Sequence, residues 1–184
     1  MFYRRKIILA LIQLLGGELE KIRIQKLLFL YSQKKKNPEY EFIPYKFGCY
    51  SFSAKADLNT MVKNGSLLEN ENYFIKNNPD DFLKTLKVED KKILSEVVQL
   101  YGNMNSNSLI KHTYINFPYY AINSTIADKV LDEKQLEKVI SSKKEVNEER
   151  INAILNRISE VSNLIPNGNV QIIGSLTEFG KRLL

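Results

Sequence analysis

Five polar side chains lie close together in a segment that the sequence predicts to be helical: Ser53, Lys55, Asn59, Thr60 and Lys63. Asparagine can form two hydrogen bonds with adenine, while lysine and serine suit phosphate or guanine. A helix of this kind reads DNA bases when it enters the major groove, and phosphate contacts then set its position. The alternative is an ordinary solvated helix face, which has the same composition.

The positive charge of the chain is concentrated in its first 65 residues. This segment contains twelve Lys and Arg against five acidic residues, whereas the remainder contains 15 basic and 16 acidic residues. A basic surface confined to one small domain is typical of proteins that contact nucleic acid. Two more clusters could supply phosphate contacts: Arg4, Arg5 and Lys6, and Lys34, Lys35 and Lys36.

An aromatic segment precedes the predicted helix, with Lys46 among its rings. Its aromatic members are Tyr40, Phe42, Tyr45, Phe47, Tyr50 and Phe52. Pro44 and Gly48 favour an extended conformation here. Such rings could stack on the bases of single-stranded nucleic acid. The alternative is a strand with one face in the core and the other at its rim.

Residues for catalysis or metal binding are sparse. Cys49 and His112 are the only cysteine and histidine, so neither a zinc site nor a disulfide within the chain is expected. A Cys–His nucleophile pair is conceivable, but a small buried thiol fits Cys49 equally well. Gly16 and Gly17 lack the lysine and preceding strand of a phosphate-binding loop. We therefore expect no catalytic residue, no metal and no cofactor.

The composition is that of a globular chain, with 184 residues of which 43% are hydrophobic. No segment approaches the roughly 20 apolar residues needed to span a bilayer. The short apolar run 7–12 after Arg4, Arg5 and Lys6 resembles a signal peptide but reads better as a buried helix. With its single cysteine, the chain is expected to be cytoplasmic.

The first 78 residues predict a winged helix-turn-helix. Helices are expected at 3–15 and 22–35, and a third follows a cap at Ser51 or Ser53 and ends before Gly65. A hairpin at 66–75 would form the wing. Glu69 and Glu71 at its tip would repel a DNA backbone.

The rest of the chain is predicted to be mostly helical. Helices are expected at 88–101, 108–115, 124–131, 133–140 and 147–164, followed by a strand and a helix at 170–184. The fold class is therefore mainly α (α+β). Its expected domains are a winged helix at 1–78, a helical domain at 79–165 and a strand–helix tail at 166–184.

The last long helix carries a possible interaction seam. Its apolar residues alternate in steps of three and four, the spacing of a coiled coil: Ile151, Ile154, Ile158, Val161 and Ile165. The seam could pack on its own domain, or form a homodimer or partner contact.

Three stretches carry a resemblance to known proteins: residues 24–31 (IQKLLFLY), 42–52 (FIPYKFGCYSF) and 117–124 (FPYYAINS). They resemble an uncharacterised bacterial two-part family with a winged-helix-like N-terminal half and a small α/β domain of unknown function. Most of that second half is missing here, although Ile172, Ile173 and Gly174 match its beginning. More distantly, the chain resembles the Panacea antitoxin-like domains, which neutralise a partner toxin. The resemblance implies a prokaryotic setting, linked to mobile elements or to defence.

The sequence thus predicts a non-catalytic nucleic-acid-binding module, with duplex DNA favoured over RNA. The alternative is a protein-binding, antitoxin-like or inhibitor module acting through its helical surface, supported by Glu69, Glu71 and the 151–165 seam. A third hypothesis is the accessory half of a truncated enzyme, because the C-terminal strand–helix tail looks unfinished.

Overall fold

The computed structural model describes residues 1–164, without the side chains of Val146 and of residues 158–164. Within this range the protein is mainly helical and contains two small antiparallel sheets, which confirms the predicted fold class at that level. The chain divides into two units, Met1–Val139 and Ile140–Leu184. The predicted strand–helix tail at 166–184 lies outside the described residues.

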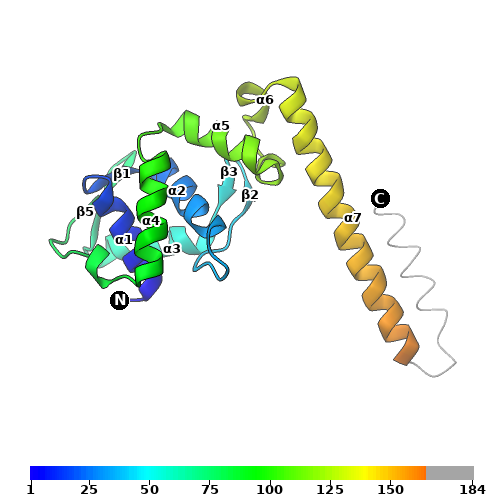
Figure 1. Cartoon of the computed structure of the whole chain (residues 1–184), viewed down its shortest axis with the longest axis horizontal. Helices are drawn as coiled ribbons and strands as arrows, with labels where there is room; N and C mark the ends of the chain where they lie inside the picture. The colour runs from blue at the N-terminus through cyan, green and yellow to red at the C-terminus, as the bar shows by residue number, and fades with distance from the viewer. Residues whose placement is uncertain (165–184) are drawn as a thin grey trace. The chain divides into compact units, whose positions relative to one another are not determined.

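Four helices of 12 to 14 residues form the framework of the first unit. They are α1 (Tyr3–Leu14), α2 (Lys21–Gln33), α3 (Phe52–Lys63) and α4 (Val88–Tyr101). Helix α4 packs against both α1 and α2 (Figure 1). Helix α1 carries the short apolar run of the sequence, and all of residues 7–12 are buried. That run therefore belongs to the hydrophobic core.

The first sheet has three strands in the order β1-β5-β4. Strand β1 (Glu18–Glu20) was not predicted, whereas β4 (Leu67–Glu69) and β5 (Tyr73–Lys76) form the expected hairpin. Leu19 of β1 lies opposite Phe74 of β5, and both side chains are buried. The chain reaches β1 through two glycines with positive φ, a conformation that other residues rarely adopt.

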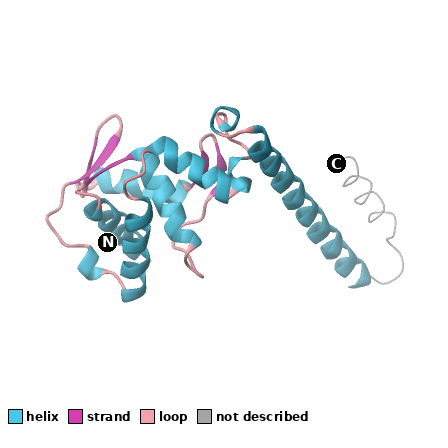
Figure 2. Ribbon diagram, turned by 45° about the horizontal axis from the view of Figure 1, so that its top comes forward, coloured by secondary structure: helices cyan, strands magenta, loops and turns pink. Residues whose placement is uncertain are grey.

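The second sheet is a hairpin of β2 (Ile43–Tyr45) and β3 (Gly48–Tyr50). It replaces the single extended aromatic segment expected from the sequence. Gly48 turns the chain with φ at +87°, and its hydrogen atoms face Tyr114, so no side chain fits there. Figure 2 shows the two sheets on opposite sides of the helices.

Shorter elements complete the first unit. They are η1 (Leu83–Thr85), α5 (Ser106–Asn116), η2 (Pro118–Ala121) and α6 (Ala127–Val130). One hydrophobic core runs from Ile8 of α1 to Leu94 of α4 and Leu109 of α5. The expected domain boundary at residue 78 therefore falls within a shared core, because α4 and α5 cover apolar faces of α1 and α2 that would otherwise be exposed.

Helix α7 (Glu133–Leu164) is continuous where the sequence predicted two helices, at 133–140 and 147–164. In the second unit, Ile154 is exposed and Ile151 is partly exposed. The structure does not describe the side chains of Ile158 and Val161, or any part of Ile165. The interaction seam therefore stays a prediction.

Candidate nucleic-acid interface

Helix α3 is held at its first turn by a polar contact from α2. The Ser51 hydroxyl accepts a hydrogen bond from the Ala54 amide at 3.2 Å, which caps the helix. Gln25 of α2 accepts from the Ser51 amide at 2.9 Å and donates to its carbonyl at 3.3 Å. Ser53 is hydrogen-bonded to the Ser51 hydroxyl at 3.0 Å. Ser53, predicted to contact DNA, therefore belongs to the cap.

The buried face of α3 is anchored to α1 by Asp57. This carboxylate accepts hydrogen bonds from Arg4 Nε at 2.5 Å, from Arg5 Nε at 2.7 Å and from the Tyr40 hydroxyl at 3.1 Å. Burial alone would raise the pKa of Asp57, but these donors outweigh it and hold that pKa below its ordinary value. Arg4 and Arg5, predicted to contact phosphate, are thus occupied within the protein.

The opposite face of α3 is exposed to solvent. Phe52, Ala56, Asn59 and Lys63 follow one another at steps of four, three and four residues, which places them on one stripe. Thr60 lies beside it and donates to the Ala56 carbonyl at 2.9 Å. Within the part of the chain that the structure describes, Lys63 forms no ion pair.

The stripe continues onto the β2–β3 hairpin through aromatic contacts. The ring of Phe52 lies 5.4 Å from that of Tyr45 and 5.0 Å from that of Tyr50, measured between ring centres. Tyr45 and Tyr50 also contact each other at 5.1 Å. We call this continuous patch the α3–hairpin surface; it consists of Tyr45, Tyr50, Phe52, Ala56, Asn59 and Lys63.

Glu69 of β4 does not act as a free negative charge. Lys21 contacts it at 2.7 Å and Lys55 at 3.7 Å, and Lys21 in particular lowers the pKa of Glu69. The repulsion of DNA expected from this wing residue is therefore offset by its neighbours. Glu71 is exposed, and no ion pair is found for it among residues 1–164.

The predicted lysine cluster after α2 is mostly neutralised by acids. Lys34 pairs with Glu96 at 2.7 Å, and Lys35 pairs with Glu39 at 2.5 Å and also with Asp90. Lys36 is exposed and Lys6 partly exposed. The structure thus does not bring Lys34 and Lys35 into the α3–hairpin surface as free cations.

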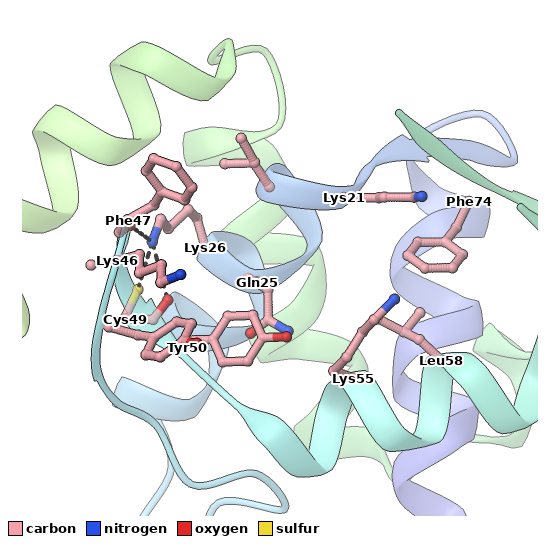
Figure 3. A pocket seen from close by; sticks show the side chains of 13 residues that line it. Lys21, Gln25, Lys26, Lys46, Phe47, Cys49, Tyr50, Lys55, Leu58 and Phe74 are labelled. Carbon is pink, nitrogen blue, oxygen red and sulfur yellow. Dashed lines mark hydrogen bonds between the residues drawn. The ribbon is translucent and has the colours of Figure 1, made fainter. Parts of the chain in front are cut away.

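A cavity of about 290 Å³ opens beside the hairpin, between the beginnings of α2 and α3 (Figure 3). Four lysines line it: Lys21, Lys26, Lys46 and Lys55. Lys26 is buried in the middle of the apolar stretch IQKLLFLY, next to Gln25. Sequence reasoning missed this cavity, although two adjacent long polar residues inside the apolar stretch 24–31 were a usable signal.

The hypothetical Cys49–His112 pair is not formed. Buried Cys49 lies next to Lys26, with 3.5 Å between Sγ and Nζ, and burial raises the pKa of its thiol. His112 instead contacts the ring of Tyr101. Within residues 1–164 no group of three His, Cys, Asp or Glu is placed to hold a metal ion. No helix in that range is long and apolar enough to cross a membrane.

No protein-family model matches this sequence, and neither does any curated protein. The similarity of residues 24–31, 42–52 and 117–124 to a bacterial two-part family therefore remains an expectation. Function has to be inferred from the residues of this chain.

Proposed function

We propose that this protein is a non-catalytic, winged-helix module that binds duplex DNA through the α3–hairpin surface. The observation that supports it is the exposed stripe of α3, whose helix is followed directly by the β4–β5 hairpin of a three-stranded sheet. In helix-turn-helix proteins the recognition helix lies in the major groove and presents a few side chains to the bases.

The chemistry of the stripe suits that role. Asn59 stands at its centre with an exposed amide, which can pair with the adenine edge. Lys63, one helical turn further on, is free to contact a phosphate. Lys46, at the turn of the β2–β3 hairpin, is also exposed and can extend the phosphate contact.

The β2–β3 hairpin is an insertion relative to a standard helix-turn-helix motif. Helix-turn-helix motifs connect their two helices by a turn of about 3–4 residues, whereas 18 residues separate α2 from α3. Because Tyr45 and Tyr50 contact Phe52, the inserted hairpin enlarges the recognition surface rather than covering it. Its rings can pack against the sugar–phosphate backbone or against an unstacked base.

The test is a salt titration of binding to a labelled random duplex, with a single strand measured in parallel. Replacing Lys63 by Gln is expected to weaken duplex binding and to reduce the slope of log K against log salt by about 1, because one phosphate contact is lost. Asn59→Ala is expected to weaken binding with an unchanged slope.

Lys92→Gln is the matched control, since it removes one charge from an exposed site on α4. Equal binding by the Lys63 variant and this control would remove α3 from the proposal. Absence of duplex binding at low salt would overturn the proposal altogether.

A second candidate is a protein-binding, antitoxin-like module. It is favoured by the apolar character of the same region, where Phe47, Phe52 and Leu68 are each about half exposed. Co-purification of a stoichiometric protein partner, lost on Phe52→Ser, together with no duplex binding, would select this candidate. In either case the buried thiol of Cys49 suits a reducing cytoplasm, and the prokaryotic setting follows from the family resemblance alone.

A further inference from the structure

The cavity beside the hairpin combines apolar walls with a strong excess of cations. Its apolar surface comes from Ile22, Tyr45, Phe47, Tyr50, Leu58 and Phe74. Small-molecule sites usually measure about 300–1,000 Å³ and combine apolar walls with a few polar groups. At about 290 Å³ this cavity is at the small end of that range. It suits a ligand with one ring system and one charged group.

Two of the lysines converge on one aromatic ring. The ammonium groups of Lys21 and Lys55 lie 5.5 Å and 5.3 Å from the ring centre of Phe74 (Figure 3). They come from α2 and α3, and both are paired with the single carboxylate of Glu69. Two positive charges therefore share one negative charge at the edge of the cavity, which leaves room for a second anion.

Lys26 adds a buried cation to the same wall. Its ammonium group donates to the Phe47 carbonyl at 2.5 Å and to the Cys49 carbonyl at 3.1 Å, and no carboxylate among the described side chains of residues 1–164 contacts it. Burial lowers the pKa of Lys26 because it removes the ammonium group from water. An ammonium group that is removed from water without a counter-ion is costly, so an anion in the cavity would offset part of that cost.

We propose that the cavity binds a free mononucleotide, with its base against the aromatic wall and its phosphate between Lys21 and Lys55. Tyr45 and Tyr50 line the cavity, are not buried and supply flat apolar surface for the base, whereas Phe74 is buried next to Lys21 and Lys55. The two lysines supply charged donors for the phosphate, in competition with Glu69. This site shares Tyr45, Lys46 and Tyr50 with the surface proposed for duplex DNA, but Asn59 and Lys63 do not line it.

The experiment is isothermal titration calorimetry of the full chain with four probes: adenosine 5′-monophosphate, adenosine, inorganic phosphate and a short 5′-phosphorylated single strand. The expected result is binding of the mononucleotide at least tenfold tighter than that of adenosine or of phosphate. Equal binding of phosphate and the mononucleotide would remove the base from the proposal. Binding of the strand without the mononucleotide, or of none of the probes, would overturn it.

Two substitutions at the cavity should act in opposite directions. Lys55→Gln is expected to weaken mononucleotide binding by tenfold or more, whereas Glu69→Gln is expected to tighten it severalfold, because the competing carboxylate is gone. If Glu69 only held the structure in place, Glu69→Gln would instead weaken mononucleotide binding. Lys92→Gln is again the control for a lost charge, and thermal unfolding checks that each variant is folded.

The two proposals can fail independently. Asn59→Ala and Lys63→Gln are expected to leave mononucleotide binding unchanged, since neither residue lines the cavity. A chain that does not bind duplex DNA can therefore still confirm the mononucleotide site, and the reverse also holds.

Discussion

Replacing Asp57 by Asn tests the contact that positions α3. The substitution keeps the shape of the side chain but removes the negative charge between Arg4 and Arg5. Asp57 is 1% exposed, so no water can take the place of the lost carboxylate without a rearrangement. The variant should therefore lose stability through the two arginines, which it leaves without a carboxylate.

The magnitude follows from how well each arginine can reach water. Removing one partner of a buried ion pair costs about 3–5 kcal/mol. The side chain of Arg4 is 41% exposed and can be solvated, whereas that of Arg5 is 16% exposed. The lower end of the range applies, at about 3 kcal/mol. A typical urea m-value of about 2 kcal/mol per M converts this to a midpoint shift of about 1.5 M.

The assay is urea unfolding at neutral pH, followed by circular dichroism. Glu96→Gln is the comparison, because it breaks the exposed pair with Lys34 and should cost less than about 1 kcal/mol. If Asp57→Asn shifts the midpoint no more than Glu96→Gln does, Asp57 does not anchor α3 and our reasoning about Arg4 and Arg5 is wrong.

Asp57→Asn should also change how the stability of the protein depends on pH. In the folded protein the pKa of Asp57 lies below the value of about 3.9 expected for an unfolded chain. Between the folded-state and the unfolded-state pKa of Asp57, the unfolded protein binds more protons than the folded protein. The free energy of unfolding therefore decreases as the pH falls through this interval. The contribution of Asp57 is complete above the unfolded pKa and is lost as the pH drops through the folded pKa. Asp57→Asn should lose less stability than the wild type between pH 5 and pH 2, as urea midpoints would show.

Two further predictions concern the β2–β3 hairpin. Gly48→Ala should destabilise the protein by about 2–4 kcal/mol, because the added Cβ would meet Tyr114 Cε1 at 2.4 Å and the residue has positive φ. Gly16→Ala, with positive φ but open space, should cost only about 1 kcal/mol, and equal urea midpoints would contradict this difference. Cys49 should react with a chromogenic disulfide reagent only after unfolding, because it is 1% exposed and burial raises the pKa of its thiol. Rapid labelling of the native protein would contradict the buried position of Cys49.

Local patterns predicted most of the elements. The spacing of apolar residues gave the helices around 3–15, 22–35 and 88–101 to within two residues at each end. Gly65 marked the end of α3, and the two candidates for its cap, Ser51 and Ser53, included the actual cap Ser51, because caps depend on neighbouring residues. Strand β1 was missed, since its three residues become a strand only by pairing with β5, more than 50 residues later.

The sequence by itself determined that the chain is mainly helical, that a hairpin follows the third helix and that positive charge gathers in the first 65 residues. Only the tertiary structure decided which of those charges are available. Arg4 and Arg5 meet Asp57 across 53 and 52 residues, and Lys35 meets Asp90 across 55. Such pairs depend on how helices pack, and neither composition nor periodicity carries that information. The cavity at Lys21, Lys26 and Lys55 arises in the same way, from segments that are distant in the chain.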